Sequence, residues 1–523
     1  MKTKKSTEAH SKRLEDVVEE PTEKNFSPLG SEVIVSSLPN RFPAFMAFAV
    51  IAGFLVYLNA LFFELPFTTY SFIEGSQQIK SLSSIPAYFL RPFESPLRGV
   101  LFSLEYAIWG VNPYGFHLIN NMLHAVASVC VGLLARELFT MRAGAFSAVA
   151  FALYPVNTDA VTGLGGAGEI LAVIFTLLSI CFFIRSNKSK VSTGSIVFFI
   201  LALFSSVTAL ALPFILIIYL VAFVGLKEIK KIIPFFIILI IYLAYYLILT
   251  PDDFLSSLSF FQKTLMMLRI FGLYFLKLFI PLNLSAWYEF LPPSRFLSFE
   301  VIIPLQVFCL SIYLSFVALR YNKRLGFIFF FILLSVLPSL HLLPLPKLMS
   351  ESNLYLPSVG LALLFGLLLS QLSYLWHIKI AGPIALVFFI VFSVLTYSRN
   401  MVWHDNYSLL SDTVIKSPRS VTLHYNLGLV LAERGDYDRA IEEYTKVIEL
   451  NPQLYSAYYN IACVHALTGK KDKALHALKW AVARGFNDLE QLRTDPELDS
   501  IRGTQAFSAI IGKVEAGTGG ALH

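Results

Sequence analysis

Long apolar runs are the feature that most constrains how this chain can fold. Many windows hold 18 or more apolar residues with few or no charges. A helix of about 20 apolar residues crosses the ~30 Å hydrocarbon core of a membrane. Only 15% of the residues are charged, against about 25% in a soluble domain, and the alternation typical of a membrane β-barrel is missing. The sequence therefore predicts an all-α, polytopic bundle of transmembrane helices.

Eleven apolar segments are predicted to span the membrane. They lie at 43–63, 114–138, 143–156, 168–185, 194–207, 209–226, 232–250, 300–320, 325–343, 354–376 and 380–397. A further segment, 262–282, is interrupted by Lys263, Arg269 and Lys277. If it crossed once, the later basic clusters would fall on the wrong side of the membrane. We therefore predict that it is re-entrant or interfacial.

Basic clusters set the expected orientation. They follow alternate spans, as at Arg185–Lys190, Lys227–Lys231 and Arg320–Arg324, and cytoplasmic loops are enriched in Lys and Arg. Residues 1–42 are polar and rich in Lys and Glu, which predicts a disordered cytoplasmic tail. Loop 64–112 and everything after the eleventh span are expected outside the cytoplasm. We predict a multi-pass protein of a bacterial inner membrane, in contact with membrane lipids.

A repeat with a period of 34 residues follows residue 420, which is the period of tetratricopeptide repeats (TPRs). The units are 421–454 and 455–486, and they form a short α-solenoid after the transmembrane domain at 43–398. Small and apolar residues recur in register at Leu427, Gly428, Leu431, Ala440, Tyr444, Val447 and Pro452, and again at Ile461, Ala462, His465, Ala474, Leu478 and Ala481. Residues 399–420 resemble a degenerate half repeat. Residues 487–523 are expected to form a C-terminal cap and tail.

Asn426 and Asn460 occupy the same position in successive repeats. In stacked TPRs this position lines the concave groove, where a side-chain amide can bond a peptide backbone. The simpler interpretation is a solvated helix face. On the first interpretation, the groove binds a protein or peptide partner.

Five stretches of the chain resemble a known family. They are Ile79–Phe89, Trp109–Leu123, Phe151–Val161, Leu354–Leu364 and Arg399–Gly428. In this order they resemble membrane glycosyltransferases of the C-type (GT-C) fold with C-terminal TPRs, like the animal transmembrane-and-TPR O-mannosyltransferases and their bacterial relatives. The resemblance covers most of residues 43–512. It implies a GT-C-like transmembrane domain, a polyprenyl-phosphate sugar as donor, and Ser or Thr of a protein as acceptor.

The chain departs from this family at positions that the resemblance implies to be charged. An acidic pair early in the first extracytoplasmic loop is replaced by Thr68 and Thr69. An Arg before Pro96 is replaced by Ser95, and a Lys-Glu pair by Ser206-Val207. Other implied polar residues are replaced by Tyr154, Asn157 and Ala167. Polar residues in membrane segments are costly and usually functional, so their loss is what a noncatalytic descendant would show.

Five carboxylates remain as candidates for catalysis: Glu64, Glu74, Asp159, Glu169 and Glu351. A carboxylate beside the acceptor hydroxyl could act as general base or metal ligand, so a divalent metal is a candidate cofactor of an active enzyme. The cofactors are otherwise unknown. Arg91 and Arg98 are candidates for binding the lipid phosphate. Glu64 also fits a structural role as an interfacial cap of the first span.

Two functions therefore stay open. The chain could be a degenerate relative that acts as scaffold or accessory subunit of a membrane or envelope complex. Alternatively, it could be an active protein O-glycosyltransferase that uses a polyprenyl-phosphate sugar. Convergence of two or more of the candidate carboxylates on one cavity at the extracytoplasmic face would favour the enzyme.

Other classes of site find little support. The net charge of +6 comes from basic clusters between spans, so no nucleic-acid partner is predicted. The four cysteines, at 130, 181, 309 and 463, have no metal-site or disulfide spacing, and no phosphate-binding loop is present. His117, Asn121 and His124 can share one helix face, where we expect a polar seam between helices rather than a metal site.

Overall fold

The computed structural model describes residues 42–90, 95–186, 191–250, 258–293, 295–375 and 378–517. All regular elements within these ranges are helices, which confirms the predicted all-α class. The predicted tail up to residue 41 and the candidate Arg91 lie outside the described residues.

Each of the eleven predicted spans coincides with helical structure. The helices are α2 (Phe42–Val56), α6 (Pro113–Leu138), α7 (Met141–Ala152), α9 (Ala167–Ile184), α10 (Thr193–Ser205), α11 (Leu212–Tyr219), α12 (Ile233–Leu249), α14 (Phe299–Tyr321), α15 (Lys323–Val336), α16 (Tyr355–Leu375) and α17 (Ile378–Met401). Seven helical segments of the described chain are long and apolar enough to cross a membrane, and α2, α7 and α10 are shorter apolar helices. The protein is therefore an integral membrane protein.

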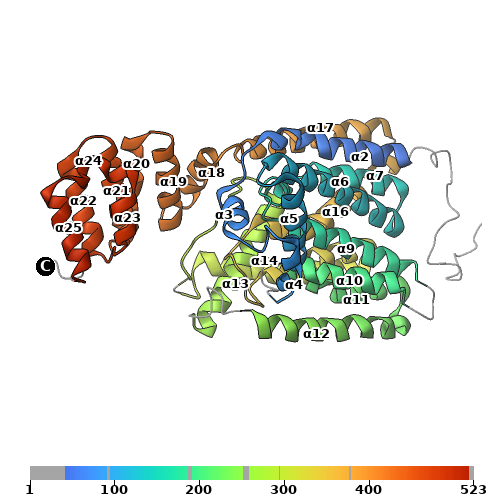
Figure 1. Cartoon of the computed structure of the whole chain (residues 1–523). Coiled ribbons are helices and arrows are strands. Elements are labelled where there is room, and N and C mark those ends of the chain that lie inside the picture. Colours follow the sequence, from blue (N-terminus) through green and yellow to red (C-terminus); the bar gives the residue numbers. More distant parts are fainter. Residues whose placement is uncertain are drawn as a thin grey trace, which may run out of the picture.

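The bundle has two distinct ends (Figure 1). At the end where α2 begins, the Phe42 ring lies 5.2 Å from the Arg136 guanidinium at the end of α6. At the opposite end, which we call the repeat face, Asn59 after α2 donates to the sulfur of Met401, the last residue of α17. The repeat module extends from this second end.

Helix α13 (Phe260–Phe279) covers most of the segment 262–282. Arg269 bonds the carbonyl of Leu291 at 2.9 Å and pairs with Glu300, in the first turn of α14, at 3.2 Å. Near its end, the Lys277 ammonium bonds the carbonyls of Leu282 and Asn283 at 2.8 and 2.6 Å. These contacts hold α13 against the segment that follows it and against the start of α14, while the re-entrant or interfacial placement of 262–282 stays a prediction.

The loop between α2 and α6 folds over the repeat face (Figure 1). It contains α3 (Phe67–Gly75), α4 (Ile85–Tyr88) and α5 (Pro96–Trp109). A small core separate from the main bundle core holds the loop together; it is made of Leu65, Ile73, Ile79, Tyr88, Phe102, Phe116, Leu164 and Ala167. The loop is thus an ordered part of the repeat face.

The repeat module is a stack of paired helices. Its elements are α18 (Asn406–Lys416), α19 (Val421–Glu433), α20 (Tyr437–Leu450), α21 (Tyr455–Leu467), α22 (Lys471–Ala483), α23 (Leu489–Thr494), α24 (Asp499–Arg502) and α25 (Gln505–Glu515). Gly428 permits close packing of the first pair, because a Cβ there would lie 2.6 Å from the Tyr444 ring. Apolar residues of α23–α25, among them Leu492 and Ile501, are buried against the second repeat.

Charged residues, two of them buried, join the repeat module to the bundle. The Arg399 guanidinium at the end of α17 lies 3.6 Å from Glu351 and 3.2 Å from Asp412 of α18. Asp412 also pairs with Lys416 at 2.6 Å, and the Lys416 ammonium bonds the Leu284 carbonyl at 2.6 Å. This chain of contacts fixes α18 on the repeat face.

Candidate functional site

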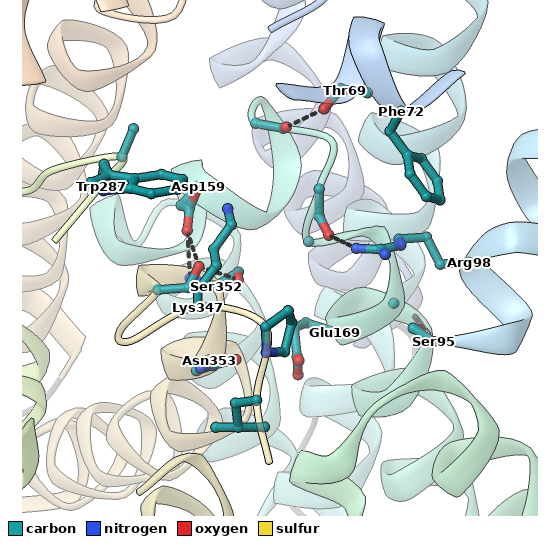
Figure 2. Close-up of a pocket in the computed structure, with 18 of the residues that line it drawn as sticks. Thr69, Phe72, Ser95, Arg98, Asp159, Glu169, Trp287, Lys347, Ser352 and Asn353 are labelled. Carbon is teal, nitrogen blue, oxygen red and sulfur yellow. Dashed lines mark hydrogen bonds between the residues drawn. The ribbon is translucent and has the colours of Figure 1, made fainter. Parts of the chain in front are cut away.

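A cavity of about 410 Å³ lies between the repeat face and the first repeat. Its walls come from the loop helices α3 and α5, the start of α9, and the segment around Ser350 (Figure 2). Side chains of α18 and α19 also line it. The cavity therefore joins the membrane half of the protein to the repeat module.

Asp159 lines this cavity from the short helix α8 (Thr158–Val161). Its Oδ2 atom accepts hydrogen bonds from the Ser350 hydroxyl at 2.9 Å and the Ser352 backbone N–H at 2.8 Å. Its Oδ1 atom accepts no hydrogen bond from any described residue. The carboxylate is thus held by one oxygen, and the other is available to a ligand.

Glu169 lines the cavity from the first turn of α9. Its two oxygens accept hydrogen bonds from the Ser206 hydroxyl at 2.5 Å and the Thr208 hydroxyl at 2.7 Å. Two neutral donors therefore occupy both oxygens, and Glu169 is less available than Asp159 to take a proton from a ligand.

Two cations belong to the same cavity. The Arg98 guanidinium donates to the Gly165 carbonyl at 3.0 Å and lies 5.3 Å from the centre of the Phe72 ring. The Lys347 ammonium lies 6.0 Å from the centre of the Trp287 ring and forms no ion pair with a described residue. Such groups suit a phosphate oxyanion, to which Arg and Lys donate strong hydrogen bonds.

Aromatic rings and small polar groups complete the lining, which includes Phe72, Tyr242, Tyr246, Trp287, Asn353 and Trp403. The Asn353 amide donates to the Tyr274 hydroxyl at 3.0 Å. A mostly apolar cavity with a few placed polar groups is typical of small-ligand sites. Sequence reasoning did not single out Lys347, Trp287 or Trp403, because they come from loops without periodic pattern. The glycine-rich run at 163–168 was a usable signal.

Three candidate carboxylates lie outside the cavity. Glu64 accepts hydrogen bonds from the backbone and side chain of Asn406 at 3.2 and 3.3 Å. Glu74 pairs with Lys80 at 3.1 Å. Glu351 is only 1% exposed and accepts from the Ser285 backbone N–H at 2.6 Å. Of the five candidates, the structure brings Asp159 and Glu169 together at the cavity.

Several of the positions that the resemblance implies to be charged lie at this cavity. Thr69, Ser95 and Ser206 all line it. The Thr69 hydroxyl donates to the Gly163 carbonyl at 3.3 Å, and the Ser95 hydroxyl donates to the Ser205 carbonyl. The replaced residues are thus neighbours in space, although they are far apart in the sequence.

The two repeat asparagines have different environments. Asn426 lines the cavity and forms no hydrogen bond with a described residue. The Asn460 amide donates to the Tyr425 hydroxyl at 3.2 Å, across the interface between the repeats.

The donor atoms of the cavity do not fit a divalent cation. Three of the four oxygens of Asp159 and Glu169 already accept hydrogen bonds from the protein, whereas hard cations need several free oxygen ligands. Among the described residues, one group of three side chains has ligand atoms close enough to hold a metal: Cys463, Asp495 and Glu497. These residues belong to the second repeat and the cap.

Comparison with known proteins agrees with this architecture. Residues 428–469 match the TPR repeat family. The chain is 24% identical over 385 residues to "Protein O-mannosyl-transferase F38B6.6" of Caenorhabditis elegans, which covers 68% of this chain and 54% of the relative. It is 22% identical over 431 residues to "Protein O-mannosyl-transferase TMTC3" of Homo sapiens, which covers 70% of this chain and 45% of the relative.

A shorter match of 85 residues is 42% identical to "Protein O-mannosyl-transferase Tmtc1" of Drosophila melanogaster, and covers 16% of this chain and 10% of the relative. The chain spans about half the length of the first two relatives. No solved structure matches it. The chain resembles proteins named as protein O-mannosyltransferases, carries a TPR match, and is a glycosyltransferase-like integral membrane protein.

Proposed function

We propose that this chain is a membrane glycosyltransferase that moves a sugar from a polyprenyl phosphate to a Ser or Thr hydroxyl of a protein. The observation that carries the proposal is the convergence of Asp159, Glu169, Arg98 and Lys347 on one cavity between the bundle and the repeat module. The names of its relatives, protein O-mannosyltransferases, support the same reaction class.

In this reaction Asp159 acts as the general base. Its free Oδ1 atom accepts the proton of the acceptor hydroxyl while the hydroxyl oxygen forms a bond to the anomeric carbon of the sugar. The bond between that carbon and the phosphate oxygen breaks, and the electron pair leaves with the polyprenyl phosphate. Arg98 and Lys347 stabilise the negative charge on the departing phosphate. The hydrogen bonds from Ser350 and Ser352 hold Asp159 in position.

The proposed orientation places the repeat module outside the cytoplasm, on the outer side of a bacterial inner membrane. Basic residues support it: Arg136 near the end of α6 and Arg185 after α9 both pair with Glu137, at the end of the bundle where α2 begins, and cytoplasmic loops are enriched in Lys and Arg. A reporter enzyme fused after His523 tests this. Activity of a reporter that works only in the cytoplasm would contradict the orientation.

A noncatalytic scaffold is the second candidate, and two observations favour it. Thr69 and Ser206 stand at cavity positions where the resemblance implies charged residues, and Ser206 and Thr208 bond both oxygens of Glu169. In that case the cavity would bind the sugar lipid or a peptide without transfer, and the repeats would recruit a protein partner.

Transfer of radiolabelled mannose from polyprenyl-phosphate mannose to a Ser/Thr peptide, by the full chain in nanodiscs, separates the two candidates. The enzyme proposal expects transfer by the wild type and a loss of about 10²- to 10⁴-fold in Asp159→Asn, since that is the usual contribution of a general base. Glu300→Gln is the matched control, because Glu300 is an acid of the repeat face that pairs with Arg269 outside the cavity. Donor binding without transfer by the wild type would establish the scaffold instead.

A further inference from the structure

The half repeat and the first repeat together form part of the cavity wall. Leu409, Leu410 and Thr413 of α18 line the cavity, as do Thr422, Leu423 and Asn426 of α19. Asp159 lines the same cavity from the membrane half of the protein. Any molecule that fills the cavity therefore touches both the repeat module and the proposed base.

Two polar side chains of this wall have unused hydrogen-bond donors and acceptors. Neither the Asn426 amide nor the Thr422 hydroxyl forms a hydrogen bond with a described residue. An Asn amide offers donors and an acceptor together, which complements the N–H and C=O groups of a peptide unit. Asn460, at the equivalent position of the next repeat, is already bonded to Tyr425. The unused hydrogen-bond donors and acceptors therefore lie on the repeat that faces the cavity.

The conformation of the bound segment follows from these groups. In a helix, backbone N–H and C=O groups bond one another, so a helical segment has none left for Asn426 along its length. An extended segment presents unpaired groups to its surroundings. A cavity of about 410 Å³ also falls in the size range of small-ligand sites, which leaves room for a short length of chain but not for a folded domain.

Several contacts hold this wall in place. The Ser417 hydroxyl after α18 donates to the Trp287 carbonyl at 3.3 Å, and the Arg434 guanidinium bonds Asp405 at 2.9 Å. Burial alone would raise the pKa of Asp405, but hydrogen bonds from Ser408 and Arg434 lower it to about 2, so this pair stays ionised. The start of α18 is thereby tied to the end of α19, and the wall is positioned before any ligand binds.

We propose that the cavity binds its acceptor as an extended polypeptide segment, with Asn426 and Thr422 bonded to the acceptor backbone. Leu410 and Leu423 beside them favour small or apolar side chains next to the acceptor hydroxyl. The identity of the acceptor rests on the proposed function, but the binding itself does not require transfer. The first repeat is then a specificity determinant of the site, and the second repeat is not.

The test measures peptide binding by the full chain in nanodiscs without any sugar donor. The probe is a short fluorescein-labelled peptide of Ala, Val, Ser and Thr, compared with a stapled helical peptide of the same composition. We expect the extended peptide to bind, and the helical one to bind at least about tenfold more weakly. Asn426→Ala removes one or two hydrogen bonds and should weaken binding by about 5- to 30-fold. Thr422→Val removes one and should weaken it by about 2- to 10-fold.

Asn460→Ala is the matched control and should leave the affinity within about twofold, because Asn460 lies outside the cavity. Equal losses in Asn426→Ala and Asn460→Ala would overturn the inference and favour a groove along both repeats. Unchanged binding in both Asn426→Ala and Thr422→Val, with thermal unfolding like the wild type, would overturn it as well. If binding depends on Asn426 but no sugar is ever transferred, the inference stands and the enzyme proposal fails. If sugar is transferred but peptide binding does not depend on Asn426, the enzyme proposal stands and the inference fails.

Discussion

The buried pair of Arg399 and Glu351 offers a stringent test of how the repeat module is held. Arg399 is 7% exposed and Glu351 is 1% exposed. In the Arg399→Met variant, Asp412 keeps its contact with Lys416 at 2.6 Å. Glu351 keeps only neutral donors, among them the Ser285 backbone N–H at 2.6 Å. The loss of stability should therefore come mainly from the Glu351 carboxylate, which stays buried without a cationic partner.

The expected loss of stability follows from the different partners that Asp412 and Glu351 keep in this variant. Removing one partner of a buried ion pair typically costs about 3–5 kcal/mol, because the other charge stays buried without compensation. The 3.6 Å separation of Arg399 and Glu351 places the expected cost near 3 kcal/mol. Adding Glu351→Gln removes the stranded charge and keeps a side chain that can still accept from Ser285. The double variant should therefore recover about 2 kcal/mol, within the usual range of coupling between contacting residues.

Thermal unfolding of the full chain in nanodiscs measures both effects. Since a chain of this kind has several cooperative units, each transition is followed separately. A loss of 3 kcal/mol lowers the midpoint of a unit of 150–250 residues by about 6–12 °C. Hydrogen exchange of α18 should rise in Arg399→Met and return toward the wild-type rate in the double variant. A double variant that unfolds at or below the midpoint of Arg399→Met would show that the stranded Glu351 charge is not the source of the loss.

Three further outcomes are expected. Both ring nitrogens of His424 face acceptors, Glu443 at 2.5 Å and the Pro418 carbonyl at 3.0 Å, an arrangement that favours the protonated imidazole. The hydrogen bond to Glu443 raises the pKa of His424, with Lys446 nearby opposing it. This contribution to stability is complete below the ordinary histidine pKa of about 6.5. It is lost as the pH rises through the pKa that His424 has in the folded protein. The unfolding temperature of the repeats should therefore decrease from pH 6 to pH 9 in the wild type and stay constant in His424→Gln. Equal decreases in both proteins would contradict this prediction. Gly428→Leu should destabilise the repeats by about 1–3 kcal/mol through overpacking. Gly512→Leu is the control and should not destabilise them, because a Cβ there meets nothing within 4 Å. Equal melting points of the two variants would contradict the packing argument. Burial raises the pKa of Glu105 to about 9, and neither of its carboxyl oxygens has a hydrogen-bond partner among the described residues. Glu105→Met should therefore stabilise the fold by about 1–3 kcal/mol. A melting point below that of the wild type would contradict this prediction.

Patterns that are local in sequence predicted much of the fold. Apolar length predicted the spans, and the period of 34 predicted the paired helices of the repeats. The polar seam was also predicted, and the His124 ring indeed bonds the Tyr355 hydroxyl at 2.7 Å. Helix ends were less accurate. The predicted span at 209–226 is a 3₁₀ turn, α11 and a π-helical turn in succession, because an apolar run does not specify which backbone hydrogen bonds close each turn.

The site depended on contacts that the sequence does not encode locally. Asp159 and Glu351 look equivalent as acidic residues in polar turns. In the fold, Ser350 and Ser352 hold Asp159 at the cavity, whereas Glu351, between these two serines, turns away toward Ser285 and Arg399. Which of two adjacent side chains faces the cavity is decided by the packing of segments far apart in the chain, and no spacing reveals it.

The glycine-rich floor of the cavity limits how this site can change during evolution. A Cβ at Gly163 would lie 2.4 Å from the Asp159 carbonyl oxygen, and one at Gly166 would lie 2.5 Å from Ala160 Cα. At Gly168 it would lie 2.7 Å from the Ser205 carbonyl oxygen. Backbone contacts of this kind cannot yield to a larger residue without displacing the carboxylates. Asn426 presents only its side chain from a helix surface, where many residues are sterically acceptable. Substitutions should therefore be tolerated more readily at the repeat wall than at these three glycines.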